Sequence, residues 1–332
     1  MTTPPIVPEY RNRQTGLIIF GIFEILLGLL SACLIPLMMF SRAMAIRQGH
    51  AAAATPPIAP GIVVYGLASV SLIWLGIGSI LARRWARALL LCLSAVALVC
   101  GLAGCVVMAF VLPHIGEAMA QAGKSAAPPA AVLVAQIVMV VFILAFFIVI
   151  PGVIFLFYRS PHVKRTCEAR DPAERWTDRC PLPVLATSLM MAFGGLCLLG
   201  MTGSFRAYPV FGFFLPHAAS AALMFLMGAL LLYLARGIYR LRLSAWWIAL
   251  CFQGLHFISN AFTFWRGGLE TWYAKMGLGQ NTTAASAQFL QTPVYKWMMV
   301  ASIVASFAWF IWIRRYFPKQ VAAGAPQVEG SI

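Results

Sequence analysis

About eight long apolar stretches, separated by short polar joints, run through this chain of 332 residues. They cover residues 17–40, 61–82, 88–112, 131–158, 183–203, 211–235, 245–265 and 297–313. A helix needs about 20 apolar residues to cross a bilayer, and in lipid it satisfies its own backbone polar groups. The pattern excludes a soluble domain. It predicts an all-α fold: a polytopic membrane helical bundle with about eight transmembrane helices.

The composition agrees with a membrane protein, because 61% of the residues are hydrophobic and only 10% are charged. Soluble domains are about 25% charged. The net charge of +15 is compatible with a nucleic-acid partner. However, most of the basic residues lie in joints beside the apolar stretches, where they would attract anionic lipid headgroups. We therefore expect membrane lipids as partners and no nucleic acid.

The basic residues also predict an orientation. Arg11 and Arg13, together with the joints at 83–87, 159–179, 236–242 and 314–319, hold most of the 24 Lys and Arg residues. Joints rich in Lys and Arg stay in the cytoplasm, so we expect cytoplasmic N- and C-termini. The joints on the opposite side contain no cysteine, so no disulfide framework is implied. Short joints and this cysteine pattern favour a bacterial inner membrane.

Similar joints suggest an internal repeat. Leu81-Ala82-Arg83 and Leu234-Ala235-Arg236 each end an apolar stretch and have another arginine four residues later. This order predicts a 4+4 parallel internal repeat with its axis along the membrane normal, and the alternative is chance similarity in Leu- and Ala-rich sequence. The expected parts are a first four-helix half at 1–158, a cytoplasmic connecting loop at 159–182, a second four-helix half at 183–317 and a short flexible cytoplasmic tail at 318–332.

Glu24 is the only acid within the predicted spans. Because a charge in hydrocarbon is costly, such a carboxylate indicates a proton relay, a cation site or a catalytic acid. Glu24 lies about two helical turns from the expected cytoplasmic end of its span. A structural pair with arginine, or a neutral and hydrogen-bonded acid, is therefore the alternative. In the suggested repeat its counterpart is Gly194.

The seventh stretch carries Gln253, His256 and Asn260, whose spacing places them on one face of a helix. This polar stripe should face other helices or water. It could line a substrate or proton path, with His256 titrating near neutral pH. The alternative is hydrogen bonding between helices, commonly worth about 1 kcal/mol or less per bond.

The longest inner joint, residues 159–182, interleaves acids with arginines, which predicts a salt-bridged and ordered loop. A catalytic or partner-binding loop is the alternative. His162, Cys167 and Cys180 lack the paired spacing of structural zinc sites, so we predict no metal. The sequence contains no phosphate-binding glycine loop and no nucleophile elbow. We therefore predict no cofactor and can name no catalytic residue.

These features favour a transporter-like or small-ligand/lipid-binding bundle, with Glu24, Gln253, His256 and Asn260 as candidate cavity-lining residues. One alternative is a non-catalytic membrane subunit or scaffold with a membrane-protein partner. Another is an intramembrane lipid-modifying enzyme, in which Glu24 and His256 would have to converge. An enzyme is the less favoured class. The arrangement of these polar residues around one cavity, or in separate helix contacts, distinguishes the alternatives.

Overall fold

The computed structural model describes residues 11–47, 58–121, 129–265, 271–272, 275 and 293–317. The expected tail at 318–332 and most of residues 266–296, between the seventh and eighth apolar stretches, lie outside these residues. The helices are α1 (Gln14–Arg47), α2 (Ala59–Ile80), α3 (Arg84–Gln121), α4 (Pro129–Leu144), η1 (Ala145–Val149), α5 (Ile150–Arg159), α6 (Pro161–Arg170), η2 (Trp176–Arg179), α7 (Leu182–Gly200), α8 (His217–Tyr239), α9 (Leu243–Trp265), α12 (Pro293–Ile313) and η3 (Arg314–Tyr316). The strands are β1 (Tyr208–Val210) and β2 (Phe213–Leu215).

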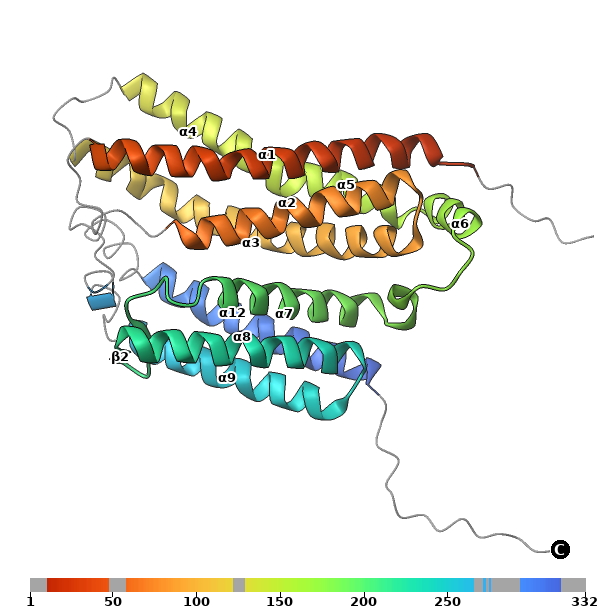
Figure 1. The fold of residues 1–332 in the computed structure, drawn as a ribbon. Coiled ribbons are helices and arrows are strands. Elements are labelled where there is room, and N and C mark those ends of the chain that lie inside the picture. Colours follow the sequence, from red (N-terminus) through yellow and green to blue (C-terminus); the bar gives the residue numbers. More distant parts are fainter. Residues whose placement is uncertain are drawn as a thin grey trace, which may run out of the picture.

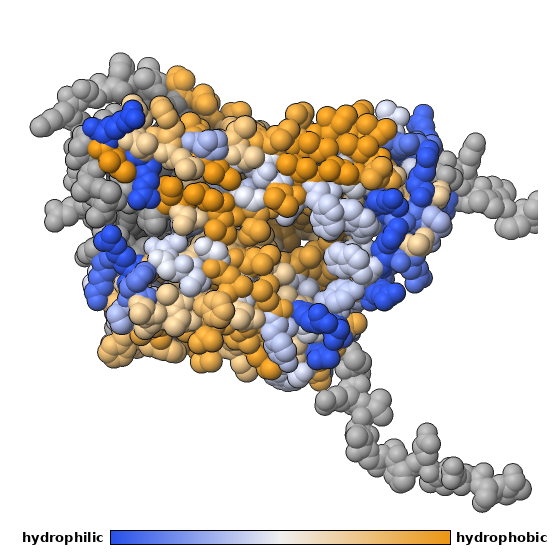
Figure 2. Space-filling model, viewed as in Figure 1, coloured by the Kyte–Doolittle hydropathy of each residue, from blue (hydrophilic) through white to orange (hydrophobic). Residues whose placement is uncertain are grey.

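The predicted all-α membrane bundle is confirmed. Within the described residues, seven helical segments are long and apolar enough to cross a membrane. Helix α9 has 23 residues and is long enough as well, but its polar stripe makes it less apolar. Large apolar side chains cover the outside of the bundle, and Figure 2 shows them as a band between hydrophilic ends.

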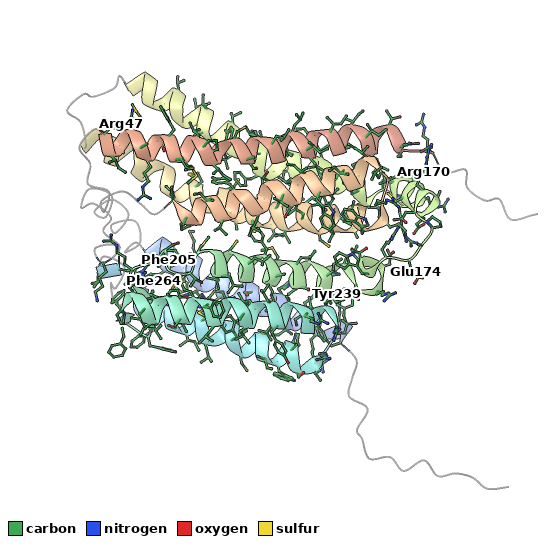
Figure 3. The ribbon with its side chains drawn as sticks, viewed as in Figure 1. Arg47, Arg170, Glu174, Phe205, Tyr239 and Phe264 are labelled. Carbon is green, nitrogen blue, oxygen red and sulfur yellow. The ribbon has the colours of Figure 1, made fainter. Side chains whose placement is uncertain are left out.

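The helices form two groups that lie side by side (Figure 1). One contains α1, α2, α3 and the α4–α5 segment, and the other contains α7, α8, α9 and α12. Helix α7 contacts both α2 and α3, so it joins the groups. Helix α6 and η2 connect them at the end of the bundle where Arg170, Glu174 and Tyr239 lie, opposite to Arg47, Phe205 and Phe264 (Figure 3).

The sixth span begins later than the sequence predicted. The prediction started it at Phe211, but α8 begins at His217, and the preceding residues form an antiparallel hairpin of β1 and β2. The turn contains Phe211 and Gly212, both with positive φ, a backbone conformation that ends regular helix. Its apolar residues resemble a span by composition alone. Pro216 then precedes the first turn of α8.

The fourth span is continuous but irregular. Helix α4 passes through a π-helical segment, η1, into α5, with Pro151 just beyond it. A Pro lacks the backbone N–H that a regular helix would use, and π-turns are a known way for a membrane helix to absorb this loss. Gly101 of α3 packs directly against the carbonyl of Phe147 in η1, so this irregular turn lies against a neighbouring backbone.

Two helix pairs approach backbone to backbone through glycines that face each other. In the α1–α2 pair, a Cβ added to Gly76 would lie 2.5 Å from the carbonyl oxygen of Gly21, and one added to Gly21 would lie 2.7 Å from that of Gly76. In the α7–α8 pair, Gly195 and Gly228 face each other's carbonyls at 2.9 and 3.0 Å by the same measure. No other residue fits these distances without movement of the helices.

The joint at 159–182 contains an ion-pair cluster centred on Asp171, whose side chain is only 2% exposed. Arg175 donates to both of its carboxylate oxygens, at 2.6 to 3.1 Å, and the backbone N–H of Arg84 donates to Oδ2 at 3.3 Å. Arg83 approaches Oδ1 at 3.8 Å. Asp171 therefore ties the end of α6 to the start of α3, as expected for a salt-bridged loop.

Gly76→Ala should destabilise the bundle, because the new methyl group would meet the Gly21 carbonyl. Overpacking of this kind costs about 1 to 3 kcal/mol. The matched control is Gly66→Ala in the same helix, since nothing lies within 4 Å of its added Cβ. Thermal unfolding in detergent checks the difference. Equal melting temperatures of the two variants would contradict the backbone contact.

Asp171→Asn should lower the melting temperature at pH 7. Hydrogen bonds from Arg175 hold the pKa of Asp171 below its usual value. The ionised carboxylate therefore stabilises the fold above about pH 4, and this stabilisation is lost as pH falls through the lowered folded-state pKa. The melting temperatures of wild type and Asp171→Asn should converge in acid. The exposed Glu174→Gln in the same joint should match wild type throughout, and an equal deficit in both variants would contradict this role.

Candidate ligand-binding cleft

Glu24 is fully buried between α1, α2 and α5. The Tyr158 hydroxyl of α5 lies 3.3 Å from its Oε1 and 2.5 Å from Oγ of Ser79 on α2. Ser79 also donates to the carbonyl of Leu17, at 2.9 Å. Oε2 of Glu24 is buried and has no hydrogen-bond partner in the described structure. This cluster therefore belongs to the first group of helices alone.

The polar stripe of α9 lies in the second group. Asn260 Nδ2 is 2.9 Å from His256 Nε2, so these two side chains pair within the helix. Gln253 donates to Ser306 of α12 at 3.4 Å. The His256 ring also stacks on Phe252, with ring centroids 6.3 Å apart. The described contacts of the stripe are thus helix contacts of α9 and α12.

The two predicted sets of polar residues do not meet. Glu24 contacts Tyr158 of α5, while Gln253 contacts Ser306 of α12 and His256 pairs with Asn260 within α9. Within the described ranges no group of three His, Cys, Asp or Glu side chains is close enough to hold a metal ion. The described residues therefore bring no cluster of acids and histidines together around one space.

A different space does exist, between α2, α3 and α7. The helices come together at both of its ends: Gly200 of α7 packs on Val63 of α2, and the Cys92 thiol of α3 lies 3.6 Å from the Leu182 carbonyl. Between these contacts they separate and leave a cavity of about 370 Å³. We call it the α2–α7 cleft. Figure 2 shows the surface hollowed between the two groups of helices.

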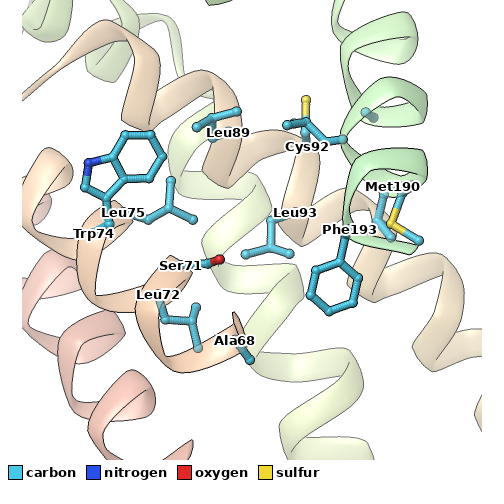
Figure 4. Close-up of a pocket in the computed structure, with 13 residues that line it drawn as sticks. Ala68, Ser71, Leu72, Trp74, Leu75, Leu89, Cys92, Leu93, Met190 and Phe193 are labelled. Atoms are coloured by element: carbon cyan, nitrogen blue, oxygen red, sulfur yellow. The ribbon is translucent and has the colours of Figure 1, made fainter. Parts of the chain in front are cut away.

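The wall of the α2–α7 cleft is almost entirely apolar. Its lining residues are Ala68, Ser71, Leu72, Trp74, Leu75, Leu89, Cys92, Leu93, Val96, Ala186, Leu189, Met190 and Phe193. Figure 4 shows the Ser71 hydroxyl among these side chains, where it supplies a polar group together with the thiol of Cys92. Such a wall can hold hydrocarbon and offers hydrogen bonding mainly at Ser71, because the Cys92 thiol already donates to the Leu182 carbonyl.

The rim of the cleft faces the region that lipid occupies. Trp74, Leu93, Met190 and Phe193 line the cleft and are also 37% to 51% exposed on the apolar surface. Trp74 is held in place by stacking on Trp85, with ring centroids 4.2 Å apart. A molecule dissolved in the bilayer can therefore reach the cleft laterally without crossing a polar surface.

The cleft cannot be recognised from the sequence, because its residues resemble any other span residues. The lining comes from three helices that are distant in the chain, and apolar side chains carry no chemical signature. The one usable signal is the small size of Ala68 and Ser71 on α2 and of Ala186 on α7, and in membrane helices small residues usually mark close packing.

The chain was also compared with known proteins. No family model matches it, and no curated protein or solved structure shows significant similarity to it.

Proposed function

We propose that this membrane bundle binds an apolar small molecule or a lipid chain in the α2–α7 cleft. The main support for this proposal is the cavity of about 370 Å³, which has an almost wholly apolar wall and a rim on the exposed apolar surface. Small-molecule sites are commonly concave, mostly apolar and about 300 to 1,000 Å³ in volume. The cleft has these properties.

The wall limits the chemistry of the ligand. A charged or strongly polar group placed there would lose its hydrogen bonds to water and find only Ser71 and Cys92 in exchange. The buried part of the ligand is therefore hydrocarbon. A single acceptor, such as an ester or ether oxygen, suits the Ser71 hydroxyl, which makes no hydrogen bond to another described residue.

Shape gives the cleft its selectivity. Within a bilayer the surrounding acyl chains are as apolar as the protein wall, so transfer from water does not drive binding. Discrimination must come from close packing against side chains such as Trp74, Leu89 and Phe193, where small gaps already reduce dispersion attraction. A rigid or branched hydrocarbon fits this requirement better than a flexible chain that loses more conformational freedom on binding.

Three other functions are proposals with less support than ligand binding in the cleft. Transport would require the ligand to leave the cleft on another side. A non-catalytic membrane subunit would use the exposed apolar surface for a partner. A lipid-modifying enzyme receives the least support, because Glu24 and His256 lie in separate helix contacts and not beside the cleft.

We also propose that the two helix groups derive from a repeat of parallel halves. The ends of α2 and α8 support this: the N–H of Arg83 donates to Gly78 at 2.9 Å, and that of Arg242 donates to Gly237 at 3.0 Å. Each turn contains a residue with positive φ, namely Ala82 (50°) and Leu241 (55°). This register equates Arg83 with Arg242, whereas the sequence pattern had equated it with Arg236.

The helix pairs support the same register. Gly28 of α1 packs on the Ser69 carbonyl of α2, as Gly195 of α7 packs on the Gly228 carbonyl of α8. The numbering difference between Ser69 and Gly228 equals that between Arg83 and Arg242. With Gly28 equivalent to Gly195, the counterpart of Glu24 becomes the apolar Met191 in place of Gly194.

We also propose an orientation in the membrane. The end of the bundle that carries α6, here called the basic end, faces the cytoplasm.

Ala186→Leu should weaken ligand binding by at least about tenfold, equivalent to about 1.4 kcal/mol. Its added atoms would fill the cleft from α7, where Ala186 is buried. The measurement is native mass spectrometry of protein released from nanodiscs, followed by titration of the retained molecule. Ala103→Leu is the matched control, since Ala103 is an exposed residue of α3 outside the cleft.

His256→Ala separates the cleft from the polar stripe. If the cleft is the site, this variant retains the molecule with wild-type affinity. Loss of the ligand in His256→Ala, with retention in Ala186→Leu, would move the site to α9 and refute the cleft. Equal weakening by Ala186→Leu and Ala103→Leu would show that added volume acts through the bilayer and would also refute it.

A further inference from the structure

The buried contacts around Glu24 permit a count of hydrogens. Three contacts join four oxygen atoms in a row: Glu24 Oε1, the Tyr158 hydroxyl, Ser79 Oγ and the Leu17 carbonyl. A carbonyl can only accept, and each hydroxyl carries one hydrogen. Two hydroxyl hydrogens cannot fill three contacts. An ionised Glu24, which brings no hydrogen, therefore leaves one contact between two bare oxygens.

A neutral Glu24 completes the count. Its carboxyl donates to Tyr158, Tyr158 donates to Ser79, and Ser79 donates to the Leu17 carbonyl. The surroundings favour the same state, because none of the ion pairs in the described residues includes Glu24. Tyr158 on α5 is the titratable group that contacts it, while α2 and the first turn of α1 supply Ser79 and the Leu17 carbonyl. An unpaired charge here would be costly in lipid.

We propose that Glu24, Tyr158 and Ser79 form a proton-binding site. Glu24 is the proton acceptor, and the two hydroxyls are the path by which the proton reaches it. In the empty site, Tyr158 donates to Glu24 and Ser79 donates to Tyr158. A proton that reaches Ser79 Oγ bonds there, while the hydrogen of Ser79 passes to Tyr158 and that of Tyr158 passes to Glu24. Each hydroxyl again holds one hydrogen, and the carboxylate becomes neutral.

The row of oxygen atoms lies near the ends of its three helices. Leu17 lies in the first turn of α1, and its N–H bonds the carbonyl of the exposed Arg13 at 3.1 Å. Ser79 is in the last turn of α2, and Tyr158 is in the last turn of α5. The row therefore leads from Glu24 toward the basic end of the bundle, one helical turn from an exposed residue.

Infrared spectroscopy of the full-length protein in lipid vesicles tests this site. A neutral carboxylic acid has a C=O stretching band that is distinct from carboxylate bands and shifts when its hydrogen exchanges for deuterium. Wild type at neutral pH should show this band, and Glu24→Gln should lack it. Tyr158→Phe removes the middle oxygen, so the band should persist but exchange at least about tenfold more slowly than in wild type, equivalent to about 1.4 kcal/mol in the barrier.

Ser79→Ala should slow exchange in the same way, which guards against misfolding of a single variant. Ser94→Ala is the matched control, because Ser94 is a buried hydroxyl in α3 that bonds within its own helix. It should exchange like wild type. Absence of a Glu24-dependent band would overturn the neutral acid. Equal exchange rates in Tyr158→Phe, Ser79→Ala and Ser94→Ala would overturn the hydroxyl path.

Discussion

The backbone contact between α1 and α2 constrains much of this bundle. In lipid, helices are not driven together by removal from water, so association depends on how closely their atoms can pack. Gly21, Gly28 and Gly76 have no side chains, so nothing holds the two backbones apart at these positions. One face of α2 is thereby committed to α1, and Ser79 on that face reaches the Leu17 carbonyl. The Glu24 cluster exists because this pair is close.

The neighbouring face of α2 has no such contact along its middle. Ala68, Ser71, Leu72 and Leu75 recur with helical spacing and point to α3 and α7, where they line the cleft. The two faces differ by a single residue step along the chain, from Ser69 to Ala68 and from Gly76 to Leu75. The same helix therefore carries a tightly packed seam on one side and a cavity wall on the other.

The sequence was sufficient for the class of fold and for most helix bounds, since long apolar stretches obey the thickness of the bilayer. It could not predict the hairpin at 208–215, because Phe211 to Leu215 is as apolar as a span. Nor could it identify Ser259 and Thr263 of α9, whose hydroxyls accept from the N–H groups of Phe211 and Gly212 at 3.0 and 2.9 Å. Glu24 was identifiable, because a single acid in hydrocarbon is conspicuous, but its partners on α2 and α5 depend on tertiary packing.

The distribution of close contacts also determines where the bundle can change shape. Within the α1–α2 and α7–α8 pairs, glycines already place backbone carbonyls at the limit of approach, so neither pair can tighten, and separating it would lose contacts along its seam. Between the pairs, α7 meets α2 and α3 at Gly200 and Leu182, with the cleft in the middle. The proposed ligand would therefore be accommodated by small movements of one pair against the other. Such movements would leave Ser79 and Tyr158 within the first helix group, so the proposed binding cleft and the proposed proton site would act separately in one bundle.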